Sequence, residues 1–220
     1  MTVRADNVDL ASACSWWQNS RDGSSLLRAA ARCLTGQPHY FAADFISDYE
    51  RRASSDLRAL EAARLLLDAV RSSPLRTTTD WCRLAGLPDT DFAGRGLQSK
   101  PEDEQIRARL ANGTIVIPLW GVSLSRDIAR SYGTRWLFLI SGAFSGVAAG
   151  MHSGVAPEQQ EVITGGRYAV LGTEKDAGTT IVRLQVMHAV SLSPLADSPG
   201  RASLAPQPAG GGHCPKQGYD

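Results

Sequence analysis

The spacing of apolar residues changes near Pro74, and this change is what most limits the fold of the chain. From about Ser24 to Val70 the apolar positions recur at intervals of three, four and seven residues, as on one face of an amphipathic helix. From Trp81 to about Val190 they form short runs separated by Gly, Asp and Asn. Helices followed by a strand-rich region predict an α+β fold and not a doubly wound parallel sheet.

Individual elements can be placed in both regions. The helical stripe is interrupted near Ser54–Asp56, where Ser55 is expected to cap a second helix, and Pro74 ends the helical part. Helices are predicted again over Pro101–Leu110 and Arg126–Tyr132. The predicted strands are Trp81–Leu84, Thr114–Trp120, Trp136–Ile140, Glu161–Ile163, Tyr168–Leu171 and Thr180–Val190.

We expect one folded unit with a tail. Residues 1–75 are predicted to form a helical lobe, in which Trp16 and Trp17 pack or contact a partner, and residues 76–190 a strand-rich core. Residues 191–220 hold five of the eleven prolines and a run of three glycines. That composition is typical of a disordered tail.

Charge and cysteine content exclude several classes of protein. The 23 basic and 22 acidic residues give a net charge of +1, so global charge cannot be what holds a nucleic acid, although a local basic groove is compatible with it. The four cysteines show neither a CxxC pair nor metal-ligand spacing. We therefore expect no metal site and no disulfide framework.

The sequence carries no sign of an export signal or a membrane segment. Its N-terminus contains acidic residues and lacks the long apolar run of a secretory signal peptide. The most apolar stretch, Trp136 to Met151, is interrupted by Gly and Ser and is shorter than the roughly 20 residues that cross a bilayer. We expect a soluble protein without membrane contact, either cytoplasmic or delivered by a specialised secretion route.

Three polar segments of the strand-rich region carry candidate chemistry. Their order along the chain is Arg83, then Ser123 and Ser125, then Gln159 and Glu161. Residues i and i+2 of an extended strand point to the same side, so each pair is expected to face one site. Arginine binds phosphate oxygens, hydroxyls hold a ribose, and a carboxylate stabilises a cationic sugar transition state.

Each segment alone also has an ordinary structural explanation. An arginine in a strand commonly lies at the surface, and Ser125 suits the N-cap of a helix over Arg126–Tyr132. A Gln-x-Glu pair is commonly solvated, and short motifs occur often by chance. The combination is what points to a ligand that carries both phosphate and sugar groups.

The order of Arg, Ser-x-Ser and Gln-x-Glu-Val resembles that of the mono-ADP-ribosyltransferases of the Arg–Ser–Glu class, the cholera-toxin-like and ecto-transferase branch, in its Gln-x-Glu subtype. In that family the arginine lies on the first core strand, Ser-Thr-Ser on the second, and Glu- or Gln-x-Glu at the start of a later strand. The resemblance covers residues 40–190 and implies a helical lobe followed by a split mixed β-sheet. This chain departs from the family at Leu124, where members have Thr, and at Leu84, where a small residue commonly follows the arginine.

The resemblance assigns roles to the motifs. Glu161 would be the catalytic residue, which holds the 2′-hydroxyl of the nicotinamide ribose and stabilises positive charge as the C1′–N bond breaks. Gln159 would face the acceptor. Members with Gln at this position modify Asn, Gln, Thr or guanine, so arginine is not the expected target. Arg83 would bind the pyrophosphate and ribose side of NAD+.

The other implied roles concern the nicotinamide end of NAD+. Ser123 would brace the nicotinamide ribose, and Ser125 belongs to the same motif. Backbone groups at Leu84 would contact nicotinamide, and Tyr132 or Trp136 would stack on nicotinamide or adenine.

The implied activity is transfer of ADP-ribose from NAD+ to a macromolecule, by a toxin or effector that needs no metal. A protein acceptor is favoured over a nucleic acid, and an immunity or inhibitor protein is a candidate partner. Two enzymatic alternatives stay open, namely transfer to a nucleic-acid base and hydrolysis of NAD+ with water as acceptor. A non-catalytic binding module is disfavoured because all three motifs are retained.

Overall fold

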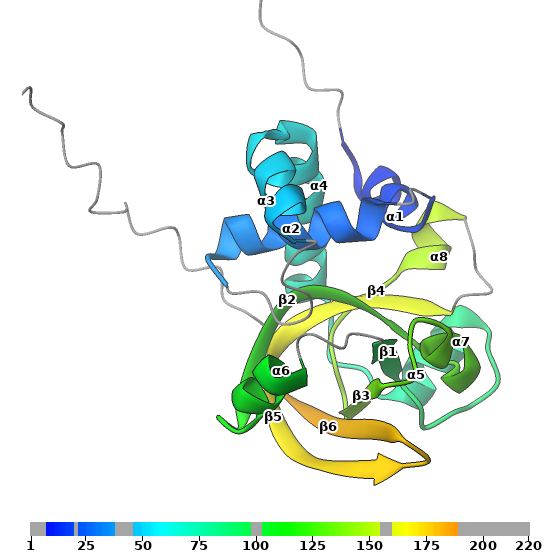
Figure 1. The fold of residues 1–220 in the computed structure, drawn as a ribbon. Helices are drawn as coiled ribbons and strands as arrows, with labels where there is room; N and C mark the ends of the chain where they lie inside the picture. Colours follow the sequence, from blue (N-terminus) through cyan, green and yellow to red (C-terminus); the bar gives the residue numbers. More distant parts are fainter. Residues whose placement is uncertain (1–7, 20–21, 38–45, 98–102, 155–159, 189–220) are drawn as a thin grey trace, which may run out of the picture.

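The structure is a computed structural model, which describes residues 8–19, 22–37, 46–97, 103–154 and 160–188. A lobe of helices comes first, and a six-stranded mixed sheet follows (Figure 1). The expected α+β class, with a helical lobe before a mixed sheet, is confirmed. The predicted tail, 191–220, lies outside the described residues.

The helical lobe consists of α1 (Leu10–Asn19), α2 (Gly23–Thr35), α3 (Ile46–Ser55) and α4 (Leu57–Ser72). Helices α2 and α4 each bury three fully covered alanines, and such small side chains let two helix backbones approach closely. Helix α1 was not among the predicted elements. In the described part of the chain, no helix combines the length and the apolar character needed to span a membrane.

The interruption between α3 and α4 occurs where the sequence predicts it, but the predicted cap is wrong. Ser55 is the last residue of α3. The N-cap of α4 is Asp56, whose carboxylate accepts hydrogen bonds from the backbone N–H groups of Arg58 and Ala59 at 3.0 Å. A carboxylate at this place also interacts favourably with the positive end of the helix dipole.

The predicted strand Trp81–Leu84 is wrong, because these residues lie in helix α5 (Thr78–Ala85). Thr77 and Asp80 form a reciprocal capping box at its start, and a glycine with φ of 68° ends it. Trp81 and the following cysteine are buried, so the apolar run is the inner face of one helical turn.

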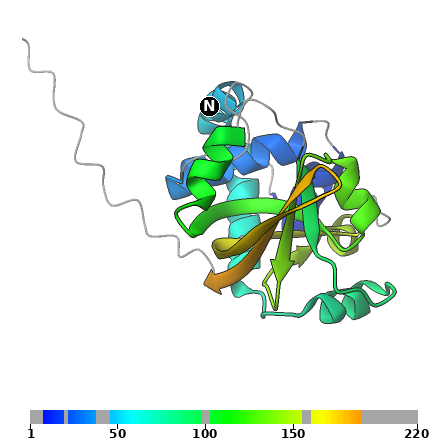
Figure 2. The ribbon, with the colours of Figure 1, turned by 60° about the horizontal axis from the view of Figure 1, so that its bottom comes forward.

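The sheet contains β1 (Gly94–Leu97), β2 (Thr114–Ser123), β3 (Trp136–Ser141), β4 (Val147–Ala148), β5 (Glu161–Asp176) and β6 (Thr179–His188). Its order is β2-β1-β3-β6-β5-β4, and β2 also pairs with β5, so the sheet curls back on itself (Figure 2). The β3–β6 pair is parallel and the others are antiparallel.

The sheet is weakest between β1 and β2. Strand β1 pairs with β3 along four residues but joins β2 through one residue pair, Gly94 with Ser123. The two strands therefore diverge beside Ser123. This divergence is where the predicted split of the sheet occurs.

Several predicted elements are confirmed with altered ends. Strands β2, β3 and β6 match three predicted strands, and helices α6 (Asp103–Leu110) and α7 (Arg126–Ser131) match the two predicted helices of the core. The predicted strands Glu161–Ile163 and Tyr168–Leu171 are parts of the single strand β5. The sequence did not predict β1, β4 or helix α8 (Ala149–Ser153), which are all short.

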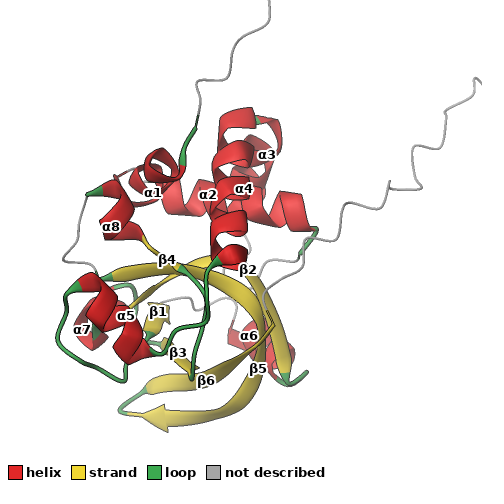
Figure 3. Cartoon of the chain, turned by 180° about the vertical axis from the view of Figure 1, so that it is seen from behind, coloured by secondary structure: helices red, strands yellow, loops and turns green. Residues whose placement is uncertain are grey.

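Two large apolar cores and a small third cluster around Leu137 hold the described layers together. The core of the lobe extends to Leu119, Val147 and Ile163 of the sheet, so the lobe packs against β2, β4 and β5 (Figure 3). The second core is formed between the curled sheet and helices α5 and α6. At its centre the indole N–H of Trp120 donates to the hydroxyl of Tyr168 at 2.9 Å, with the two rings edge to face.

Tyr168 makes the stability of the fold sensitive to alkaline pH. Burial raises the pKa of its hydroxyl to about 12, whereas an unfolded tyrosine ionises at about pH 10. Between these values the unfolded chain loses a proton that the folded chain keeps, so the free energy of unfolding falls by about 1.4 kcal/mol per pH unit. Tyr168→Phe should remove this contribution to the slope. Urea unfolding of both proteins from pH 9 to pH 12 measures it, and equal slopes would contradict the prediction.

Candidate active site

Glu161 is a buried carboxylate at the first position of β5. It pairs in register with Ser123 of β2, beside the point where β1 and β2 diverge. Glu161 is 8% exposed. Burying an ionised group is costly unless partners compensate for the lost water, so the groups around this carboxylate are informative.

Three elements surround the carboxylate oxygen Oε1. The indole N–H of Trp17, on α1, donates to it at 3.0 Å. The guanidinium Nη1 of Arg95, on β1, lies 4.0 Å away. Oε1 occupies space that Gly121 of β2 leaves open, because a Cβ on this glycine would lie 1.9 Å from Oε1. The lobe and two strands thus together fix the carboxylate.

Arg95 is held from two sides. Its Nη1 donates to the carbonyl oxygen of Gly121 at 3.1 Å, and its guanidinium lies over the ring of Tyr132 at 4.4 Å from the centroid. Its Nε is buried and has no hydrogen-bond partner among the described residues. An oriented guanidinium with unused donor capacity suits an anionic ligand with several oxygens.

A second cation, Arg28 of α2, lies near the same carboxylate. Its Nε donates to the carbonyl of Ser24 at 3.1 Å and its Nη2 to the hydroxyl of Ser25 at 3.2 Å. Burial, and next the positive charge of Arg95, lowers the pKa of the Arg28 guanidinium, and Glu161 offsets this in part. Two neighbouring cations therefore share one carboxylate, which leaves a positive potential that favours an anion.

The two serines of the Ser-x-Ser motif play different structural roles. Ser123 is buried at the end of β2, opposite Glu161, and its Oγ accepts the backbone N–H of Ser125 at 3.0 Å. Ser125 is the N-cap of α7, and its Oγ accepts the backbone N–H of Ile128 at 3.5 Å. The predicted cap is confirmed, and Ser123 is the serine that lies beside the carboxylate.

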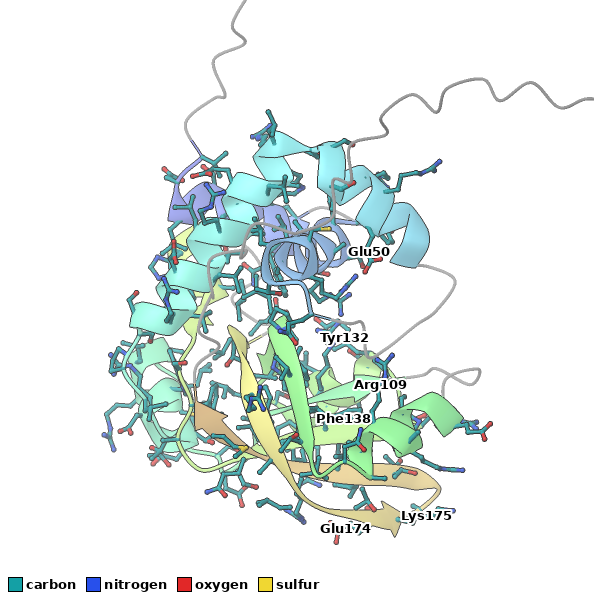
Figure 4. The ribbon with its side chains drawn as sticks, turned by 90° about the vertical axis from the view of Figure 1, so that its left-hand side faces the viewer. Glu50, Arg109, Tyr132, Phe138, Glu174 and Lys175 are labelled. Atoms are coloured by element: carbon teal, nitrogen blue, oxygen red, sulfur yellow. The ribbon has the colours of Figure 1, made fainter. Side chains whose placement is uncertain are left out.

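Tyr132 ends α7 on the side of the sheet that faces the lobe. Figure 4 shows it between the helices of the lobe and the strands of the sheet. It is 39% exposed. Partial burial and then the negative charge of Glu161 raise the pKa of its hydroxyl, so it stays protonated at neutral pH. Of the predicted ring-stacking candidates, Tyr132 lies at the site.

Arg83 and Leu84 are not brought to this carboxylate. Both lie in α5, where the side chain of Arg83 is 73% exposed and pairs with Asp80 at 3.4 Å. The placement of Arg83 on the first core strand is therefore wrong, since that strand is β1 and its arginine is Arg95. Leu84 is exposed as well.

The predicted orientation of Gln159 also needs correction. Gln159 lies outside the described residues, but the next residue, Gln160, has φ of 50°, in the left-handed region. Gln159 and Glu161 would share one side only if the backbone between them were extended. At Gln160 it is not extended.

Sequence reasoning missed Arg95, Arg28 and the contact made by Trp17. For Arg95 a signal was present, because Gly96 follows it, as a small residue follows the arginine in the family pattern. The reason is visible here, since a Cβ on Gly96 would lie 2.1 Å from the carbonyl oxygen of Gly133. Within the described ranges, no three His, Cys, Asp or Glu side chains group so as to hold a metal ion.

Comparison with solved structures identifies the fold. The chain is similar to Vis, an ADP-ribosyltransferase toxin from Vibrio splendidus. For Vis in complex with the M6 inhibitor the TM-score is 0.51 and the identity 16%, over 85% of this chain and 76% of Vis. For Vis in complex with agmatine the values are 0.50 and 14%, over 84% and 77%. No protein-family model matches the sequence, and no curated protein matches it. The fold is that of an ADP-ribosyltransferase.

Proposed function

We propose that this chain is a mono-ADP-ribosyltransferase that moves ADP-ribose from NAD+ to a protein side chain, as a toxin or effector. The observation that carries the proposal is the convergence of Arg95, Ser123 and Glu161 from three strands of a sheet with the ADP-ribosyltransferase fold. These are the residue types, in the order, that the sequence motifs require, with Arg95 in place of Arg83.

NAD+ binding in this proposal uses the two cations of the site. The diphosphate lies against Arg95 and Arg28, whose mutual repulsion an anion relieves. Arg95 offers phosphate or ribose oxygens its outer nitrogens and its Nε–H, which has no partner among the described residues. The ring of Tyr132 packs against the guanidinium of Arg95, and its exposed part faces the nicotinamide side of the substrate.

Glu161 supplies the charge that the reaction needs. Its carboxylate accepts a hydrogen bond from the 2′-hydroxyl of the nicotinamide ribose and lies close to the positive charge that develops at C1′. The C1′–N bond breaks, and nicotinamide leaves with the bonding electron pair. The acceptor then forms a bond to C1′ and gives up a proton. Ser123, opposite Glu161 in the sheet, braces the ribose.

The acceptor is proposed to be a protein side chain other than arginine. The resemblance assigns Gln159 to the acceptor, and its amide can orient a carboxamide or hydroxyl but supplies no negative charge for a guanidinium. The net charge of +1 gives a nucleic acid no strong attraction to the chain. Transfer to a base and hydrolysis of NAD+ are the alternative outcomes of the test below.

The test is to incubate the protein with NAD+ labelled in its adenylate part and with cell lysate, and then to digest with protease or nuclease. We expect a macromolecular label that protease removes. Glu161→Gln should lower both transfer and NAD+ hydrolysis by about 10²–10³, because it removes the charge that stabilises the transition state, while calorimetry shows nearly unchanged NAD+ affinity. Full activity of this variant would refute the assignment. A label sensitive to nuclease would move the acceptor to nucleic acid.

Arg95 and Arg83 form a matched pair for testing NAD+ binding. Arg95→Lys should weaken NAD+ binding by about tenfold or more, because an ammonium cannot reproduce the planar arrangement of donors. Arg83→Lys, on exposed α5, should leave the dissociation constant unchanged. Calorimetric titration of both variants decides between them, and the reverse pattern would return the role to Arg83.

Gln159→Ala should separate transfer from NAD+ chemistry. We expect it to keep most of the NAD+ hydrolysis and to lose most of the transfer to the acceptor, because Gln159 is assigned to the acceptor and not to C1′. Both activities are measured on one preparation. A loss by the same factor in both would place Gln159 in the NAD+ site and remove the argument about acceptor class.

A further inference from the structure

We propose that Trp17 is a positioning residue, whose indole N–H fixes the orientation of the Glu161 carboxylate for the reaction. This inference rests on the proposed function, because it assigns Trp17 to the same site. It differs from what the sequence predicts for Trp17, which is packing of the lobe or contact with a partner.

The contacts divide the two oxygens of Glu161 between different tasks. Oε1 accepts the N–H of Trp17 at 3.0 Å, faces Arg95 and lies against Gly121. Oε2 receives no hydrogen bond from the described residues. One oxygen is thus held by the protein, and the other is left for the ribose hydroxyl of the substrate. Holding a reacting group in one orientation before the substrate arrives lowers the entropic cost of reaching the transition state.

The donor itself is well fixed. Trp17 is 2% exposed within the core of the lobe, so its ring has little freedom. The next residue, Gln18, accepts a hydrogen bond from the hydroxyl of Ser153 in α8. Helix α1 therefore contacts both α8 and the first residue of β5. An indole N–H can donate but not accept, so it pairs with the carboxylate without exchanging a proton with it.

Trp16 offers a control on the same helix. It also packs against the core of the lobe, but its ring lies under the guanidinium of Arg58, at 5.5 Å from the centroid. A change at Trp16 therefore perturbs the packing of α1 without removing a hydrogen bond to Glu161.

The experiment compares Trp17→Phe with Trp16→Phe in NAD+ hydrolysis by the full chain. We expect Trp17→Phe to lower kcat about tenfold, the effect of losing one hydrogen bond to a charged group, while KM for NAD+ stays within twofold. Trp16→Phe should leave both constants unchanged. Thermal unfolding and near-ultraviolet circular dichroism check that both variants are folded.

A second replacement removes the N–H without altering the packing. Site-specific incorporation of 3-benzothienylalanine at position 17 keeps a bicyclic ring of similar size and replaces N–H with sulfur. It should reproduce the kcat loss of Trp17→Phe with a melting temperature no lower than that of Trp17→Phe, because the ring still fills its place in the core. Unchanged kcat in this protein would overturn the positioning role. A wild-type chain with no NAD+ activity would instead overturn the proposed function and this inference with it.

Discussion

The arrangement of this protein depends on one buried carboxylate and the cost of burying it. A carboxylate taken out of water must be compensated by donors or cations, and leaving it unpaired would cost several kcal/mol. Glu161 meets this requirement with an indole N–H from the helical lobe and a guanidinium from β1, and it occupies the space that a glycine of β2 leaves open. These partners are far apart in sequence, so satisfying one side chain requires the lobe and the sheet to dock in one register.

The same site keeps an electrostatic imbalance. Arg28 and Arg95 lie near each other, and the attraction of Glu161 only partly offsets the cost of burying Arg28. Perturbed pKa values of this kind recur at functional sites as well as in structural ion-pair networks. The positive charge of this cluster is one of the features that support the proposed binding of the NAD+ diphosphate.

Much of the architecture can be predicted from local sequence patterns, and the failures share a cause. The helical lobe, β2, β3 and β6 follow from apolar periodicity, and Glu161 and Ser123 follow from short motifs. Strand β1 has four residues, of which two are glycines, so it shows no alternation of apolar and polar side chains. Its pairing with β3 along all four residues stabilises it as a strand. The strand predicted at Trp81 is wrong because Thr77 and Asp80 form a capping box, which starts a helix there. The contact of Trp17 with Glu161 has no local signal at all.

The hydrogen bond between Trp17 and Glu161 spans 144 residues, which has a consequence for how the protein is made. A ribosome adds about 5–20 residues per second, so Trp17 is synthesised roughly 7 to 29 s before its partner exists. The strand pairing that places Glu161 beside β2 is equally non-local. A nascent chain therefore cannot assemble the site until β5 has emerged, and a product truncated before residue 161 carries the helical lobe without the carboxylate.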